Sequence, residues 1–180
     1  MASERFLVGA ALVAMIASAL ASTRPAAADI EGDSFLSETY GLRATLPRGW
    51  RITESTGYPR TLLWLSRSKP RVRISVAVDP IAADCRTGAT FCNRDPSSVS
   101  QTLEAHLRAA GFDVRGSSSP SRTPTLDYTI GRAHLRHAIV IVGDWVVSVI
   151  IAADSPADLS TMARTFDRIV QSIRPLAPAQ

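Results

Sequence analysis

Two long apolar runs separated by two turn residues constrain this chain more than any other feature. They span 133–142 and 145–153, and Gly143-Asp144 between them has the composition of a tight β-turn. In a two-residue register Val142 faces Trp145, and the pairs that follow are apolar on both faces. Such a hairpin belongs in the centre of a sheet that is covered on both sides, or it presents one face to a partner.

Other segments alternate as strands. Residues 41–46 place apolar side chains on one face and polar ones on the other, and 61–68 and 71–79 form the next pair, joined by a turn at Lys69-Pro70. In 71–79 the valines and Ile74 point inward, whereas Arg71 and Arg73 point outward. Residues 125–130 are expected to form a further strand.

Two helices are predicted. The first begins near Pro96, capped by Ser97 or Ser98, carries an apolar stripe from Val99, and stops at Gly111. The second has a stronger start signal, because Ser155 is a good cap, Pro156 suits the first helical position and Asp158 lies near the free amides. Pro175 is expected to end it. The apolar face of this second helix comprises Leu159, Met162, Ala163, Phe166, Ile169, Val170 and Ile173.

The first 28 residues resemble an export signal rather than part of the fold. Arg5 precedes an apolar stretch from 6 to 21, and small residues suited to cleavage follow at Ala19-Leu20-Ala21 and Ala26-Ala27-Ala28. A retained anchor is the alternative, but the stretch is shorter than the ~20 residues of a membrane span. We therefore expect a periplasmic or secreted protein with no stable membrane anchor after cleavage.

These patterns predict an α+β protein, in which an antiparallel β-sheet is flanked by helices in a single domain. The expected divisions are a signal peptide at 1–28, a flexible lead-in at 29–37, the domain at 38–175 and a tail at 176–180. A domain of this length can bury a full hydrophobic core.

Cys85 and Cys92 are the only two cysteines of the chain. An exported protein with an even number of cysteines is expected to pair them, and a local disulfide would pin the loop that holds them. A redox-active pair needs closer cysteines, so the predicted role is structural.

Of the 20 basic residues of the chain, 19 are arginine, and a series of them falls in the first half of the expected exported chain: Arg43, Arg48, Arg51, Arg60, Arg67, Arg71 and Arg73. Arg43, Arg71 and Arg73 occupy outward positions on predicted strands. If those strands are neighbours, the three form a basic face that could bind an anionic partner. The alternative is a solvated face that only keeps the sheet soluble. Nucleic acid is not an expected partner, because the protein is predicted to be exported and exposed aromatic residues do not interleave with the arginines.

The sequence offers no catalytic or metal-binding motif, nucleophile elbow, phosphate loop or dinucleotide fingerprint. Of the three histidines, His106 lies on the first predicted helix. His134 and His137 are three apart, which on a strand sends them to opposite faces. Asp127 on a neighbouring strand would leave a metal site incomplete. No catalytic residue, metal ligand or cofactor is therefore predicted.

The order of elements, with short motifs at both ends of the domain, resembles the PsbP-like and Mog-like superfamily, including the bacterial DcrB-like and LpqN-like exported proteins. The resemblance covers nearly the whole exported domain. It implies an antiparallel sheet flanked by helices and a non-catalytic role in binding proteins or supporting envelope assemblies. Its residues are Gly41, Leu46, Pro47, Gly49 and Trp50 at the front, and Phe166, Ile169, Val170, Ser172 and Ile173 at the back.

The function hypothesis is thus an exported, non-catalytic binding or accessory protein of the cell envelope that acts through contacts with an unknown envelope protein or an anionic surface. A carrier of a small ligand or anion is the alternative and would need a closed pocket with convergent arginines. A hydrolase is the third hypothesis and would need histidine or acidic side chains within hydrogen-bond reach of one another.

Overall fold

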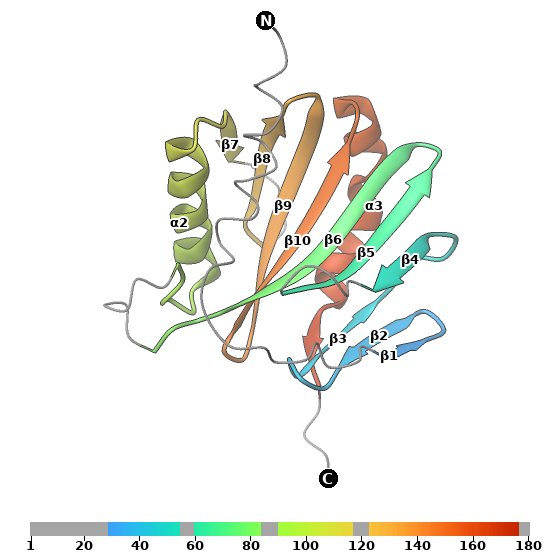
Figure 1. Cartoon of the computed structure of the whole chain (residues 1–180), viewed down its shortest axis with the longest axis horizontal. Helices are drawn as coiled ribbons and strands as arrows, with labels where there is room; N and C mark the ends of the chain where they lie inside the picture. The colour runs from blue at the N-terminus through green and yellow to red at the C-terminus, as the bar shows by residue number, and fades with distance from the viewer. Residues whose placement is uncertain (1–28, 55–59, 84–89, 117–122, 177–180) are drawn as a thin grey trace, which may run out of the picture.

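A computed structural model describes residues 29–54, 60–83, 90–116 and 123–176 of the chain. Within these ranges two antiparallel sheets and two helices form the fold (Figure 1). The small sheet has the order β1-β2-β3-β11 and the large one the order β4-β5-β6-β10-β9-β8-β7. The strands are β1 (Asp29–Glu31), β2 (Ser34–Ser37), β3 (Leu42–Thr45), β4 (Arg51–Glu54), β5 (Thr61–Ser68), β6 (Arg71–Pro80), β7 (Val114–Gly116), β8 (Thr125–Ile130), β9 (Ala133–Val142), β10 (Trp145–Ala153) and β11 (Arg174–Pro175), and the helices are α2 (Pro96–Ala109) and α3 (Pro156–Ser172).

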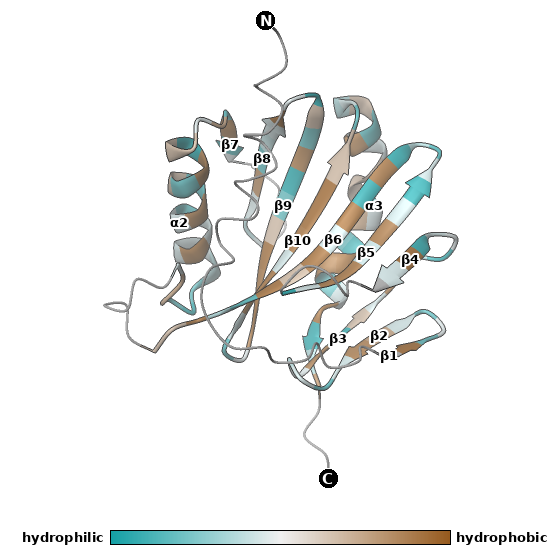
Figure 2. Ribbon diagram, viewed as in Figure 1, coloured by the Kyte–Doolittle hydropathy of each residue, from teal (hydrophilic) through white to brown (hydrophobic). Residues whose placement is uncertain are grey.

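The β9–β10 hairpin has the predicted register, with Val142 opposite Trp145 and Val140 opposite Val147. β10 also pairs along its whole length with β6, so the hairpin occupies the middle of the large sheet. Val147 and Val146, neighbours on β10, belong to hydrophobic clusters on opposite faces of the sheet. The pattern of apolar residues on both faces therefore correctly predicted a central hairpin. Figure 2 shows the hydrophobic residues of β9 and β10.

α3 packs on one face of the large sheet and starts as predicted. The Ser155 hydroxyl accepts a hydrogen bond from the Asp158 backbone N–H at 3.1 Å, with Pro156 in the first turn. Phe166 is fully buried in a core that also includes the inner faces of β3, β5, β6 and β10. This core accounts for most of the buried apolar residues described.

The end of α3 differs from the prediction. The helix stops at Ser172, and Ile173 takes an extended conformation instead of continuing to Pro175. Proline disfavours the helical conformation of the residue before it, so the chain is extended at Arg174 as well. Arg174 then pairs with Arg43 as β11, and Leu176 donates its N–H to the Gly41 carbonyl at 2.8 Å. Burial of Ile173 holds this return of the chain against the core.

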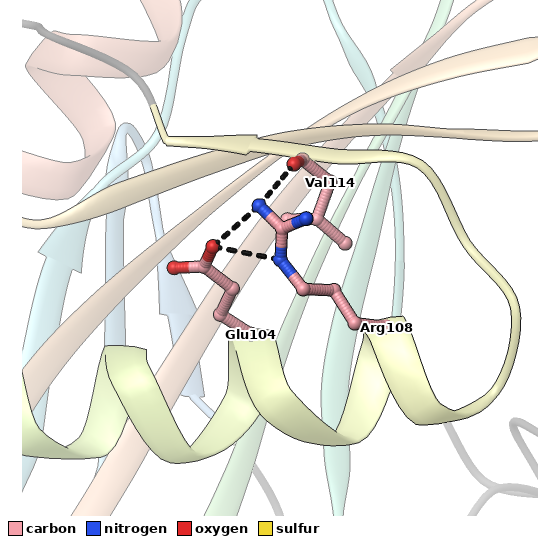
Figure 3. A network of polar contacts seen from close by, with 3 residues as sticks. All are labelled: Glu104, Arg108 and Val114. Atoms are coloured by element: carbon pink, nitrogen blue, oxygen red, sulfur yellow. Dashed lines mark hydrogen bonds and ion pairs between the residues drawn. The ribbon is translucent and has the colours of Figure 1, made fainter.

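α2 packs on the opposite face, over the β7, β8 and β9 end of the sheet. Its cap is Asp95, whose carboxylate accepts from the Ser98 N–H at 2.9 Å, rather than Ser97 or Ser98 as predicted. Asp95 directly precedes Pro96, and the proline takes the first helical position that suits its missing N–H. Figure 3 shows how the other end of α2 is attached.

That attachment is made by Arg108. Its guanidinium donates to the Glu104 carboxylate, one turn earlier, and to the Val114 carbonyl at 2.7 Å on β7. The same side chain thus joins the helix to an edge strand of the sheet.

The segment 29–37, predicted as a flexible lead-in, contains two paired strands. β2 pairs with β3, and Phe35 is fully buried opposite Ala44. The prediction of a flexible segment was wrong because polar residues surround the few apolar ones that anchor it. Phe35 is fully buried and Ile30 packs against the same core, so apolar burial and strand pairing together order the segment.

No helix in the described ranges is both long and apolar enough to cross a membrane. The predicted signal peptide at 1–28 lies outside the described residues, so cleavage and export stay predictions. The architecture confirms the predicted α+β class of antiparallel strands and flanking helices in one domain.

Candidate functional site

A concentration of positive charge beside a concave surface lies at the turn between β5 and β6. There a hollow of about 630 Å³ is bounded by the start of β4, the ends of both strands and the turn itself. Five basic side chains line it together with two serines and a glycine; they are Arg51, Arg67, Lys69, Arg71, Arg73, Ser66, Ser68 and Gly49. We call this site the basic hollow.

Strand register explains why these residues meet. Arg51 lies opposite Ser66, which in turn lies opposite Arg73, so three neighbouring strands contribute one row. Directly opposite residues in an antiparallel pair project to the same face. Val72, between Arg71 and Arg73, is buried in the α3-side core, and the alternation therefore sends both arginines to the other face, as predicted.

The positive charge of the basic hollow is barely neutralised. Arg71 has a long contact of 3.9 Å from Nε to Asp154 Oδ2, between two well-exposed side chains. Within the described residues Arg51, Arg67, Lys69 and Arg73 make no ion pair, and no carboxylate lines the hollow. Guanidinium groups bind carboxylates and phosphates through paired hydrogen bonds, so this arrangement is suited to an anion.

Of the three arginines predicted to share a face, Arg71 and Arg73 lie together in the basic hollow. Arg43 does not line it: β3 pairs with β2 and β11 in the small sheet, where Arg43 lies opposite Arg174. The condition that the strands be neighbours therefore fails for Arg43, and the expected three-arginine face is not formed.

Sequence reasoning missed Arg51, Arg67 and Lys69 as members of the site. The sequence could have predicted that Lys69 belongs to the site. Lys69 lies in the turn that joins two predicted strands, and a turn lies beside the outward residues at the strand ends that it connects. Arg51 could not be placed without knowing that β4 pairs with β5. Arg67 lies two residues after Leu65 on β5, so its side chain projects to the same face as the buried Leu63 and Leu65. It reaches the hollow only because the sheet ends there.

The histidines do not assemble a second site. His134 lies opposite Ala153 and His137 opposite Ile150, so the two side chains project to opposite faces of the sheet, as predicted. Asp127 is held by Arg136 through two hydrogen bonds of 2.8 Å. Within the described residues no group of three or more histidine, cysteine or acidic side chains is placed to hold a metal ion.

His137 is nevertheless unusual in its burial. Its ring lies 6.4 Å from that of Tyr128, and among the described residues neither ring nitrogen of His137 has a hydrogen-bond partner. Burial lowers the pKa of His137 to about 4 and raises the pKa of Tyr128 to about 12. A buried imidazole of this kind is neutral near pH 7.

Cys92 is not a free thiol in the described part of the chain. Cys85 lies outside the described residues, so its pairing with Cys92 stays a prediction.

Comparison with known proteins identifies the fold. No protein-family model matches the chain, and neither does any curated protein. Among solved structures, cyanobacterial PsbP (CyanoP) from Synechocystis sp. PCC 6803 has a TM-score of 0.52 at 12% identity, covering 88% of this chain and 98% of CyanoP. The Ran-binding protein Mog1p of Saccharomyces cerevisiae has a TM-score of 0.49 at 9% identity, covering 81% of this chain and 95% of Mog1p.

The likeness to CyanoP extends over nearly all of both chains, although the sequences have diverged widely. The narrower resemblance to DcrB-like and LpqN-like exported proteins stays a prediction. At the level of the fold, the sequence-based assignment is confirmed: the chain has a PsbP-like fold.

Proposed function

We propose that this protein is an exported, non-catalytic accessory protein of the cell envelope and that it binds an anionic partner through the basic hollow. The observation that carries the proposal is the gathering of five exposed basic side chains around one concavity without a lining carboxylate. Like charges held this close repel one another, and a bound anion relieves that repulsion.

The form of the basic hollow favours a macromolecular partner over a carried small ligand. All five basic side chains are exposed, so the site is an open surface rather than a closed pocket. Pockets that carry small molecules enclose most of the ligand surface in an apolar lining. An open, charged concavity instead suits the polar rim of a protein interface.

The non-catalytic part of the proposal draws on how the titratable side chains are arranged. The described lining of the basic hollow consists of arginine, lysine, serine and glycine, without a histidine, cysteine or acidic side chain to act as a general acid or base. His137 is buried on the large sheet, and Asp127 is engaged by Arg136. Binding is therefore the activity that these residues support best.

Export is supported by the apolar stretch and the small-residue cleavage sites in 1–28. Mass spectrometry of the protein from its native host tests it directly. We expect an amino terminus near Asp29, or near Ser22 if the earlier site is used. Recovery of the intact Met1 form from the soluble cytoplasm would reject the envelope role.

Binding is tested with polyacrylate, a soluble polyanion. Titration calorimetry measures its affinity for the protein at increasing salt concentrations. The test variant replaces Arg67, Arg71 and Arg73 by Gln. The matched control removes the same charge elsewhere, through Arg43→Gln, Arg115→Gln and Arg132→Gln, all exposed residues outside the hollow.

We expect the parent and the control to bind polyacrylate with an affinity that falls as salt rises, and the test variant to bind at least several-fold more weakly. Equal weakening in the two variants would mean that only net charge matters, and the proposed function of the basic hollow would be rejected.

A further inference from the structure

A second hollow, of about 420 Å³, adjoins the basic hollow. It lies beside α3 and shares Arg67 with the first. The connection from β3 to β4 runs between the two hollows, and its residues line them alternately. Arg48 and Trp50 line the second hollow, whereas Gly49 and Arg51 line the first. The two concavities are thus separated by one short stretch of chain and joined at one arginine.

The second hollow also carries excess positive charge. Arg48 is neutralised by Asp33 through a hydrogen bond of 2.6 Å, which raises the pKa of Arg48. Arg168 on α3 donates only to the Arg164 carbonyl of its own helix, at 3.4 Å, and has no ion pair among the described residues. Across both linings Asp33 is the one described acid beside seven basic side chains: Arg48, Arg51, Arg67, Lys69, Arg71, Arg73 and Arg168.

These cations lie on both faces of the large sheet. Arg73 projects away from the α3-side core, whereas Arg168 belongs to the helix that covers the α3 side. Arg67 lies between them, at the end of the sheet. A flat lipid surface cannot contact both faces at once, but a flexible chain can pass around the end of the sheet.

The ladder between β4 and β5 also ends at this end of the sheet. β4 begins its pairing at Arg51 opposite Ser66, whereas β5 and β6 remain paired as far as Ser68 opposite Arg71. In the described structure, no strand therefore lies beside β5 from Arg67 onward. An unpaired strand edge can bind an extended peptide through main-chain hydrogen bonds.

We infer that the two hollows form one continuous site for an extended acidic segment of a partner protein, with its carboxylates divided between the two faces of the sheet and Arg67 at the crossing point. This inference rests on the proposed function. Successive side chains of an extended peptide point to opposite sides, which matches a site with cations on both sides of a strand edge. Arginine forks bind such carboxylates by paired hydrogen bonds.

The probe is a fluorescein-labelled peptide of consecutive Glu residues, whose carboxylates point alternately to the two sides of an extended chain, and its binding to the purified protein is followed by fluorescence anisotropy. Three single variants report on the parts of the site: Arg73→Gln on the basic hollow, Arg168→Gln on the second hollow and Arg67→Gln on the crossing point. Arg132→Gln is the matched control, because Arg132 is exposed in the turn between β8 and β9 and lines neither hollow. Thermal melts verify that each variant is folded.

We expect Arg73→Gln and Arg168→Gln each to weaken peptide binding roughly two- to fivefold, as for exposed ion pairs, and Arg67→Gln to weaken it at least as much. Arg132→Gln should bind like the parent. On the parent protein alone, NMR amide shifts on peptide addition should change both near Ser66–Ser68 and near Thr165–Arg168. That second measurement does not depend on how any variant folds.

Three outcomes would overturn the inference. Peptide binding that requires Arg73 but is indifferent to Arg168 would confine the site to the basic hollow, and the proposed function would survive. Binding to phosphatidylglycerol vesicles with no binding of the peptide would make the anionic partner a membrane and again reject only the acidic segment. If peptide, vesicles and polyacrylate all fail to bind, the proposed function is rejected as well.

Discussion

The two faces of the large sheet are covered in different ways. On the α3 side the core is continuous from the small sheet across β5, β6 and β10, and five residues of α3 are buried in it. On the α2 side the apolar cluster is smaller, and α2 buries only Val99, Ser100 and Leu103. Polar contacts supplement this side, including the Arg94 ion pair with Asp144 at the hairpin turn and the Arg108 bridge to β7.

This difference shows how a small domain can assign separate roles to two layers. Free energy from apolar burial grows with the area removed from water, so the α3 side contributes most of the stability. The α2 side tolerates a buried histidine, His137, that has no hydrogen-bond partner in the described part of the chain, a feature that costs stability. The basic hollow lies where neither helix covers the end of the sheet.

The largest effect is expected from Phe166→Ala on the α3 side. Loss of a fully buried phenylalanine should lower the free energy of unfolding by about 3 to 5 kcal/mol, through lost transfer energy and a cavity. Leu103→Ala is the matching change on the α2 side and should cost about 2 kcal/mol, because Leu103 is at the margin of its cluster. Denaturant unfolding followed by circular dichroism measures both. Equal costs would contradict the unequal roles of the two layers.

The second prediction concerns acid and the α2 side. Because burial lowers the pKa of His137 from 6.5 to about 4, the unfolded chain takes up a proton that the folded chain excludes. The free energy of unfolding should therefore fall as pH drops from about 6.5 toward about 4, by about 3 kcal/mol in all. Above pH 6.5 the imidazole is neutral in both states and contributes no pH dependence.

The control for that titration is His137→Leu. Leucine removes both unpartnered nitrogens at similar size, so stability at pH 7 should stay the same or rise, and the loss between pH 6.5 and 5 should become smaller. Denaturation curves across this pH range measure it in both proteins. Identical pH profiles for parent and variant would show that His137 does not cause the acid sensitivity.

A third, smaller effect is expected from the predicted pair of Cys85 and Cys92. Phe91, next to Cys92, belongs to the α2-side cluster, so the disulfide would pin the chain that leads into that layer. Replacing both cysteines by Ser should cost about 2 to 3 kcal/mol by the chain-entropy estimate for so short a loop and leave the fold intact. Thiol labelling of unreduced protein gives an independent answer, since full modification of both cysteines would rule the pair out.

The smallest effect is expected at Arg108. Arg108→Ala removes the hydrogen bonds to Glu104 and Val114, and a largely exposed contact of this kind should cost about 1 kcal/mol. Hydrogen exchange should increase at α2 and β7 and stay unchanged at α3. A global increase in exchange would mean that the two layers unfold as one unit.

The sequence predicted elements well where local chemistry and periodicity agree. Gly143-Asp144 between long apolar runs fixed the register of β9 and β10, and Ser155-Pro156 with Asp158 fixed the start of α3. It failed at 29–37, because short strands with one large fully buried side chain, Phe35, carry too little periodic signal to be separated from a polar segment.

The candidate site was predictable only in part. Alternation on one strand correctly placed Arg71 and Arg73 outward, because a strand repeats every two residues whatever its neighbours are. Joining Arg51 and Arg67 to them, and separating Arg43, required knowing which strands pair.

The sequence by itself thus determined the two helices, the longer strands with their inward and outward faces, and the central hairpin, since these follow from turn chemistry and periodicity within each segment. Only the tertiary structure decided that β3 belongs to a separate sheet, that β4 stops short of the β5–β6 turn and that α3 brings Arg168 beside Arg67. The physical reason is that strand pairing and helix docking join residues far apart in the chain, and the free energy of those contacts depends on both partners at once.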